Sequence, residues 1–169
     1  MKTMLVLFCM ALIARQAVAL AVNDLAPDFN APSTSGETIR LSGLKGSWVV
    51  LYFYPKAFTP GCTKESCSLR DGYAYVQKQG AKILGVSLDD IETQTRFKKE
   101  YALPFDLISD SKKEISKAYG TLGAMAAYSE RKTFIISPDG KIAHIFDKVN
   151  VDDHDAEVVA MLEKLKAGK

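Results

Sequence analysis

Apolar and polar positions along the chain change their period several times, and each change marks an expected element. An unbroken run of β-branched and aromatic residues, Trp48 to Tyr54, predicts a buried strand. Downstream, stretches with helical spacing alternate with short apolar runs. In chain order, the expected elements are a strand at 48–54, a helix at 63–79, a strand at 82–87, a helix at 91–101, a strand at 105–108, a short helix at 112–119, strands at 133–136 and 141–146, and a helix at 155–166.

The order of these elements is βαβ followed by ββα. A crossover helix joins the first two strands, so they should be parallel. The turn residues Pro138-Asp139-Gly140 predict an antiparallel hairpin between the last two strands. With a cysteine at the first strand-to-helix junction, this order predicts an α/β, thioredoxin-like fold with a mixed central sheet and helices on both faces. The chain has 169 residues, a length that suits one such domain, which we expect over 22–169.

Residues 1–21 predict a cleavable secretory signal peptide. Lys2 supplies a positive start, Met4 to Ile13 is apolar, and small residues allow cleavage after Ala19 or Ala21. The apolar run is about ten residues, half of the roughly twenty that cross a bilayer, so we expect no stable membrane insertion after its removal. The predicted location is outside the cytoplasm, in the periplasm or an equivalent lumenal or extracellular compartment.

The charge and the histidine positions limit which classes of partner and cofactor are expected. The chain has 22 basic and 20 acidic residues, and loss of Lys2 and Arg15 with the leader would leave 20 of each. No basic block is present, which argues against nucleic acid and against an anionic membrane surface. His144 and His154 lie in no motif with metal-ligand spacing, so we expect a satisfied strand histidine, a surface histidine and no cofactor.

Two cysteines remain once the leader, with Cys9, is removed. Cys62 lies in the first turn of the helix that begins near Pro60, and Cys67 follows five residues later. Unpaired N–H groups and the positive end of the helix dipole favour a thiolate at Cys62. The pair alone is compatible with a structural disulfide, with thiol exchange or with copper binding.

The segment YFYPKAFTPGCTKESCSLRD, residues 52–71, resembles the active-site region of atypical two-cysteine peroxiredoxins of the bacterioferritin-comigratory or Q type. Its most specific part is Pro55-x-x-x-Thr59-x-x-Cys62. Further similar stretches follow in family order, including one at Arg131-Lys132-Thr133-Phe134, so the resemblance covers essentially all of 22–169. It implies a thiol-dependent peroxidase that reduces hydrogen peroxide and organic hydroperoxides.

The resemblance implies a role for each site residue. Cys62 would be the peroxidatic cysteine and Cys67 the resolving cysteine, which together form an intramolecular disulfide. Thr59 and Arg131 would donate hydrogen bonds to the peroxide, with the N–H groups of Gly61 and Cys62, and Pro55 would shield the thiolate. A thioredoxin-like donor would reduce the disulfide, and members of this family are often monomers. Glu65 matches an acidic family position and is expected either to hold Arg131 or to be a solvated acid of the first turn.

The spacing of the cysteines adds a geometric demand. Residues five apart on an α-helix have Cα atoms about 8 to 9 Å apart, whereas a disulfide tolerates no more than about 7 Å. A permanent bridge would therefore abolish the helix that holds it, and a redox switch requires the segment from Pro60 to about Ser68 to unwind on oxidation. Two alternatives remain, an exported thioredoxin-fold copper-binding assembly factor, with His144 as a third ligand, and a general thiol-disulfide oxidoreductase. The first normally has three residues between its cysteines and the second has two, against four here.

Overall fold

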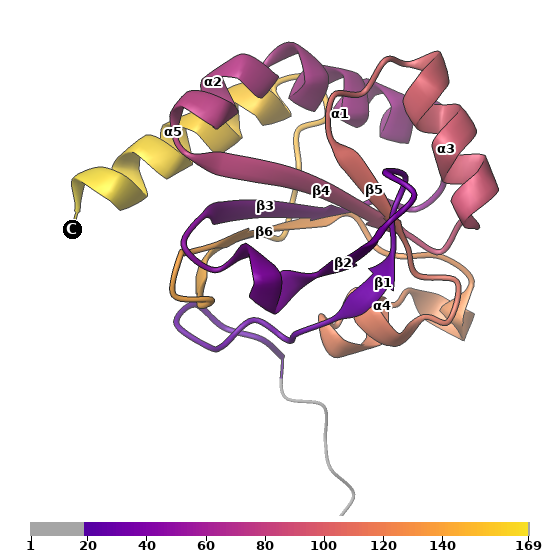
Figure 1. The fold of residues 1–169 in the computed structure, drawn as a ribbon, viewed down its shortest axis with the longest axis horizontal. Helices are drawn as coiled ribbons and strands as arrows, with labels where there is room; N and C mark the ends of the chain where they lie inside the picture. The colour runs from indigo at the N-terminus through magenta and orange to yellow at the C-terminus, as the bar shows by residue number, and fades with distance from the viewer. Residues whose placement is uncertain (1–18, 169) are drawn as a thin grey trace, which may run out of the picture.

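The computed structural model describes residues 19–168, in which a five-stranded sheet carries helices on both faces (Figure 1). Nearly all of the predicted signal peptide lies outside the described residues. In chain order, the elements are β1 (Asn30–Pro32), β2 (Thr38–Arg40), the 3-10 helix η1 (Leu41–Leu44), β3 (Trp48–Phe53), α1 (Pro60–Asp71), α2 (Tyr73–Lys78), β4 (Ala81–Ser87), α3 (Ile91–Glu100), β5 (Asp106–Ser109), α4 (Glu114–Ala118), the 3-10 helix η2 (Ala124–Ala126), β6 (Lys132–Ile136), β7 (Ile142–Phe146) and α5 (His154–Ala167).

The central sheet has the strand order β5-β4-β3-β6-β7. Strand β3 pairs parallel with β4 and antiparallel with β6, and β6 and β7 form the expected antiparallel hairpin. The mixed sheet predicted from the sequence is therefore confirmed. All six residues of β3 are buried because this strand has a neighbour on each side and a layer of side chains on each face.

Two apolar clusters fill the space on either side of the sheet. Alternate β3 residues such as Val50 and Tyr52 pack with residues of α1, α2, α3 and α5, and the intervening ones, such as Leu51 and Phe53, pack with β1, η1 and α4. Figure 1 shows α1, α2 and α5 above the sheet, with α4 and the β1–β2 hairpin below it. Among residues 19–168, no helix combines the length and apolar character that crossing a membrane requires.

The largest departure from the predicted elements is the helix expected at 63–79. The helix begins at Pro60, as the position of Cys62 in its first turn requires, but it is divided at Gly72 into α1 and α2. Periodicity could not locate this break, because its cause is the close approach of α5. A Cβ on residue 72 would lie 2.4 Å from the Cβ of Asp155. Glycine lets the end of α1 pack against the start of α5, and this contact positions α1 over the sheet.

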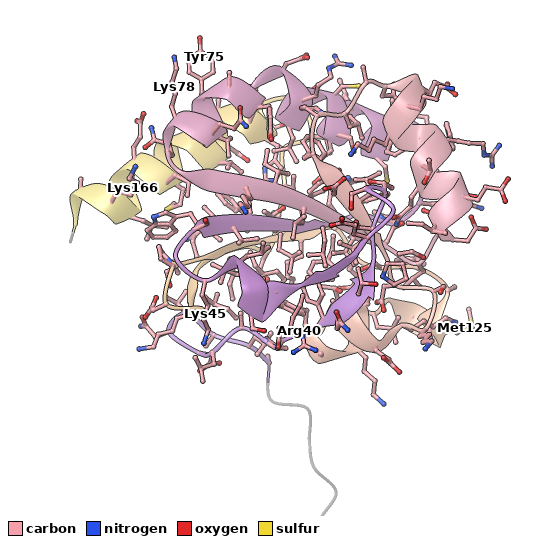
Figure 2. The ribbon with its side chains drawn as sticks, viewed as in Figure 1. Arg40, Lys45, Tyr75, Lys78, Met125 and Lys166 are labelled. Atoms are coloured by element: carbon pink, nitrogen blue, oxygen red, sulfur yellow. The ribbon has the colours of Figure 1, made fainter. Side chains whose placement is uncertain are left out.

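The Gly- and Ala-rich loop after α4 contains η2 and the bridge between Leu122 and Ser129. Met125 in this loop has φ 56° and is 96% exposed, and Figure 2 shows it projecting away from the domain. The loop ends at Arg131, the residue before β6. Arg131 belongs to the candidate site, so the loop connects that site with the outer surface of the domain.

Candidate active site

Cys62 lies on the third residue of α1, just beyond the carboxyl end of β3. Thr59 is the N-cap, with extended backbone, and Pro60 occupies the first helical position, which needs no N–H donor. The first hydrogen bond into the helix runs from Thr63 N–H to Thr59 O at 2.9 Å. Helix geometry therefore leaves the N–H groups of Gly61 and Cys62 without an intrahelical acceptor, next to a cysteine that is 1% exposed.

The loop between β3 and α1 is held by Asp89, which lies just after the end of β4. Ala57 N–H donates to Asp89 Oδ2 at 2.8 Å, and the Ser87 hydroxyl donates to the same oxygen at 2.8 Å. Strands β3 and β4 are parallel, so both end at the same edge of the sheet, and the Asp89 carboxylate can reach the loop after β3. This contact fixes where α1 begins and hence where Cys62 lies.

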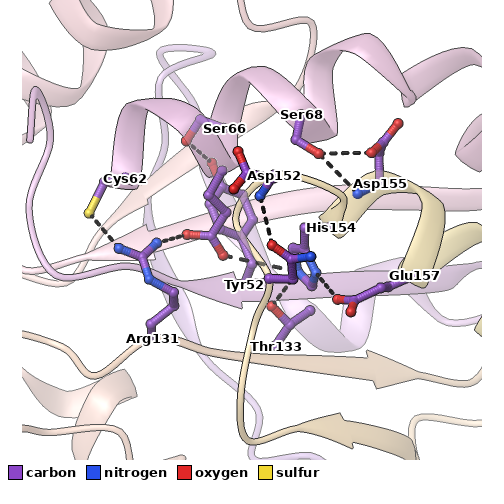
Figure 3. Close-up of polar contacts among 12 residues, drawn as sticks. Tyr52, Cys62, Ser66, Ser68, Arg131, Thr133, Asp152, His154, Asp155 and Glu157 are labelled. Carbon is purple, nitrogen blue, oxygen red and sulfur yellow. Dashed lines mark hydrogen bonds and ion pairs between the residues drawn. The ribbon is translucent and has the colours of Figure 1, made fainter. Parts of the chain in front are cut away.

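Arg131 reaches the same edge from the other side of β3. The antiparallel register pairs Phe53 with Lys132, so the residue before Lys132 lies next to the end of β3. The Arg131 side chain points at the start of α1, where its Nη2 donates to Cys62 Sγ at 3.3 Å (Figure 3). Residues 69 positions apart in the chain thus form the central contact of the site.

The other arm of the Arg131 guanidinium donates from Nη1 to Glu65 Oε2 (Figure 3). Glu65 is fully buried, and burial raises its pKa to about 7 although Arg131 opposes the shift. Burial acts to lower the pKa of Arg131, but Glu65 and Cys62 together raise it above its ordinary value. One guanidinium therefore interacts with two acidic groups, the Glu65 carboxyl and the Cys62 thiol, in a site with little solvent.

A permanent positive charge beside a buried sulfur favours the thiolate, which is the nucleophilic form of cysteine. The same guanidinium can stabilise negative charge that develops on a departing oxygen. Together with the free N–H groups of the first helical turn, these donors suit a reaction in which a thiolate attacks a polar bond and expels an oxyanion.

Comparisons with known proteins agree with this chemistry. A model of the AhpC/TSA family matches residues 22–145. The chain belongs to the AhpC/TSA family. It is 42% identical to the putative peroxiredoxin bcp of Coxiella burnetii over 86% of this chain and all of that one, and 36% identical to peroxiredoxin Bcp of Escherichia coli K12 over 86% and 97%. The bacterioferritin comigratory protein of Xanthomonas campestris has a solved structure with a TM-score of 0.76 and 32% identity over 80% of this chain and 90% of that one.

The chain is a peroxiredoxin of the Bcp or Q type, a thiol-dependent peroxidase, as the resemblance of residues 52–71 implied. This membership displaces both alternatives, the copper-binding factor and the general thiol-disulfide oxidoreductase. Among residues 19–168, moreover, no group of three or more His, Cys, Asp and Glu side chains is placed to hold a metal ion. His144, the third ligand required by the copper alternative, lies on β7 with its ring centroid 4.5 Å from that of Phe146.

The structure brings most of the predicted site residues of this peroxiredoxin together. Arg131 contacts Cys62 directly, and a Cβ on Gly61 would lie 3.3 Å from Arg131 Nη2, so a side chain at residue 61 would displace the guanidinium by a few tenths of an ångström. Pro55 is half-buried in the loop between β3 and α1. The Thr59 hydroxyl, however, donates to Lys56 O at 2.8 Å, and the structure gives it no bond to Cys62. Its predicted contact with peroxide stays a prediction.

Two residues differ from their sequence-based interpretation. The possibility that Glu65 is a solvated acid was wrong, because it is fully buried and holds Arg131. The interpretation of His154 as a surface histidine was also wrong, since it is 0% exposed and bonds Thr133 Oγ1 at 2.9 Å. Only the packing of α5 against α1 and β6 reveals the burial of this histidine. Arg70 and Asp71 form an ion pair on the surface of α1, 2.8 Å apart.

Cys67 is half-buried and lies in the same intact helix as Cys62, and both thiols are free. At helical spacing their Cα atoms are about 8 to 9 Å apart, too far for a disulfide. The residues on either side of Cys67 are also held by side-chain hydrogen bonds. The Tyr52 hydroxyl is 3.0 Å from Ser66 Oγ, and the Ser68 hydroxyl donates to Asp155 Oδ1 at 2.8 Å. A disulfide therefore requires the first two turns of α1 to open.

We expect amide hydrogen exchange to detect this opening. In the oxidised chain, amides from residue 63 to about residue 68 should exchange far faster than in the reduced chain, because their helical bonds are broken. Helix α4 (Glu114–Ala118) packs on the other face of the sheet from α1 and should exchange equally in the two states. Equal protection of α1 in both states, with mass spectrometry proving the Cys62 to Cys67 disulfide, would contradict the prediction.

Proposed function

We propose that this peroxiredoxin reduces hydrogen peroxide and organic hydroperoxides through Cys62 as the peroxidatic cysteine and Cys67 as the resolving cysteine. The single observation that carries the proposal is the Arg131 guanidinium, 3.3 Å from Cys62 Sγ and paired with a buried carboxylate on its other arm. A fixed cation in that place favours both the attacking thiolate and the departing oxyanion.

The proposed cycle has three steps, and atoms and electrons balance in each. The Cys62 thiolate attacks the terminal oxygen of ROOH, the O–O bond breaks, and RO⁻ leaves and takes a proton to become ROH. The Cys67 thiol then attacks the sulfur of the Cys62 sulfenic acid, and the disulfide forms as water is released. A dithiol donor supplies two electrons and two protons by thiol-disulfide exchange, which restores both thiols. Thr59, Gly61 and Pro55 have the roles of peroxide donor, backbone donor and shield.

An apolar rim beside the site supports organic hydroperoxides as substrates. Phe58, one residue before the N-cap of α1, is 38% exposed and packs on Phe97 with ring centroids 5.2 Å apart. Its φ of 64° is unusual for an aromatic residue, and contacts with Phe97 and Tyr101 hold it there. The bacterioferritin comigratory protein of Xanthomonas campestris, a relative with a solved structure, has alkyl peroxide reduction activity. A carbon chain attached to the peroxide could lie along this rim.

The remaining partners and the location are part of the same proposal. A thioredoxin-like protein that works outside the cytoplasm is the reductant, because the predicted signal peptide directs the enzyme into an oxidising compartment. The enzyme acts as a monomer there, since Cys62 and Cys67 lie in one chain and a disulfide-linked dimer is not needed. Antioxidant defence of that compartment follows as the cellular role.

The disulfide provides the test. We use the full chain with Cys9→Ser, so that the two cysteines of α1 are the only thiols, and mix the reduced protein with one equivalent of tert-butyl hydroperoxide. Both thiols should disappear, and peptide mapping should find one Cys62 to Cys67 disulfide within a single chain. Cys67→Ser should consume one equivalent and then stop, even with a thioredoxin-like donor present. Continued turnover of that variant at the rate of the parent chain would refute the resolving role.

A further inference from the structure

Two reciprocal hydrogen bonds join the last turn of α1 to the first turn of α5 (Figure 3). The Ser68 hydroxyl donates to Asp155 Oδ1 at 2.8 Å, and Asp155 N–H donates to Ser68 Oγ at 3.1 Å. Asp155 is the second residue of α5, and the N–H groups of a first turn have no acceptor within their own helix. Ser68 therefore completes α5 while Asp155 holds α1. We call these two bonds the Ser68–Asp155 clasp.

The packing around the clasp restricts rotation of α1 about its axis. Gly72 lies one turn after Ser68 on the same side of the helix, and a Cβ there would be 2.4 Å from the Cβ of Asp155. Arg70, between them in the chain, donates from Nη1 to Tyr101 O at the end of α3, at 3.0 Å. The last turn of α1 is therefore held by both α5 and the end of α3.

The clasp lies beside the proposed resolving cysteine. Cys67 directly precedes Ser68, and successive side chains of an α-helix point about 100° apart. While Ser68 is turned toward α5, Cys67 stays about 140° around the helix axis from Cys62. The clasp must therefore release before Cys67 can turn toward Cys62 and form the disulfide.

Oxidation of Cys62 loosens the first turn of α1 and leaves the clasp intact. Arg131 Nη2 lies 3.3 Å from Cys62 Sγ, and a neutral sulfenic acid attracts this guanidinium less strongly than a thiolate does. The bonds between Ser68 and Asp155 join groups that peroxide does not change. The clasp therefore still opposes the opening of α1 once the first step of the cycle is complete.

While the disulfide has not yet formed, a second peroxide can react with Cys62. The sulfur of the Cys62 sulfenate attacks the terminal oxygen of a second ROOH, the O–O bond breaks, and ROH leaves with the peroxide proton as a sulfinate forms. The Cys67 thiol competes for the same sulfur. Because the sulfinate is not returned to the thiol in this cycle, the ratio of the two rates fixes the peroxide concentration that inactivates the enzyme.

We propose that Asp155 is a positioning residue for the second step, which holds α1 closed through the clasp and so sets the peroxide concentration that over-oxidises Cys62. The inference rests on the proposed function, because it assumes that Cys62 and Cys67 form the disulfide. Without the clasp, α1 opens more readily and the disulfide forms sooner. The attack of the thiolate on peroxide precedes the opening and does not depend on the clasp.

The experiment follows a single turnover of the full chain with Cys9→Ser, reduced and mixed with excess hydrogen peroxide in the absence of a donor. Samples quenched over time are mapped by mass spectrometry, which measures the thiol, disulfide and sulfinic acid forms of Cys62. Ser68→Ala removes both bonds of the clasp, so the disulfide should form about tenfold faster, the scale for a hydrogen bond to a charged group. The peroxide concentration that converts half of Cys62 to sulfinic acid should rise by the same factor, while the thiol is lost at the parent rate.

Variants of Asp155 test whether the effect comes through the clasp. Asp155→Ala should give most of the effect, and Asp155→Asn, whose amide oxygen can still accept, should lie between it and the parent chain. Adding Asp155→Ala to Ser68→Ala should change neither measurement further, because both act on one contact. Glu163→Ala is the matched control, since Glu163 Oε1 joins α5 to Gln79 Nε2, at 3.2 Å and beyond the end of α1. It should behave as the parent chain does.

The outcomes separate the inference from the proposed function. If the parent chain forms the disulfide but Ser68→Ala forms it no faster, the clasp only supports the fold and the inference is overturned. The same conclusion follows if Ser68→Ala lowers the yield of sulfinic acid equally in Cys67→Ser, which has no second step. If the parent chain forms no Cys62 to Cys67 disulfide, the proposed function itself fails. Should Ser68→Ala fail to fold, Asp155→Asn replaces it, with the same direction of change expected.

Discussion

Replacing Cys62 with serine should abolish peroxide reduction, lowering the rate by roughly 10⁴-fold or more, the scale seen when a catalytic nucleophile is removed. A serine hydroxyl stays protonated at neutral pH, even beside Arg131, so the site keeps its cation and loses its nucleophile. Serine is close to cysteine in size, and the buried position at the start of α1 should accept it. The fold, followed by circular dichroism, should therefore be unchanged while peroxide consumption stops.

Cys67→Ser is the matched control for this substitution, because it removes the other thiol of the same helix. It should still react once with peroxide at nearly the parent rate, since Cys67 acts only after the O–O bond has broken. Peroxide consumption in the first turnover therefore separates the two cysteines. If Cys62→Ser consumes peroxide as the parent does, while Cys67→Ser is inactive from the start, the roles assigned to the two cysteines must be exchanged.

The second large effect is expected at Arg131. Arg131→Met keeps an unbranched side chain but removes the charge and both donors, so the peroxide rate constant should fall by about 10²- to 10³-fold, as for the loss of an oxyanion-hole donor. The Glu65 carboxyl would also lose its partner, and breaking a buried pair costs about 3 kcal/mol of unfolding free energy. Stopped-flow kinetics and chemical denaturation measure the two effects separately.

A compensating variant keeps this prediction independent of folding. Arg131→Met combined with Glu65→Gln leaves no unpaired charge, so the free energy of unfolding should recover most of the loss. The peroxide rate constant should not recover, because the thiolate still has no cation. Recovery of both together would show that Arg131 serves the fold and not the reaction. Arg131→Lys, which keeps the charge but loses the two-armed geometry, should fall between the parent and Arg131→Met.

The sheet and the catalytic cysteine could be predicted from the sequence because their causes are local. The apolar run at 48–54 can be buried only as a central strand, and Pro60 fixes the start of the helix that carries Cys62. The role of Arg131 came from the resemblance, since nothing in the local pattern places residue 131 beside residue 62. The register between Phe53 and Lys132 supplies the physical reason.

What the sequence could not predict depends on how α1 and α5 pack. In the sequence, Gly72 is one residue of low helix propensity within a long helical pattern. The structure gives the reason for the break there, which is the close approach of Asp155. Glu65 and His154 are charged or titratable residues in polar surroundings along the chain, and both become fully buried only where the two helices meet. These contacts join segments about 90 positions apart, beyond the reach of periodicity or spacing. They are also the contacts that connect the thiolate site with the rest of the fold.

Trapping the sulfenic acid tests the central claim most directly. The full chain with Cys9→Ser and Cys67→Ser is reduced, mixed with one equivalent of hydrogen peroxide in the presence of dimedone, and mapped by peptide mass spectrometry. The attack of the Cys62 thiolate on peroxide predicts one dimedone adduct, on Cys62, that is absent without peroxide and absent from Cys62→Ser. Consumption of the peroxide while Cys62 remains an unmodified thiol would contradict the account.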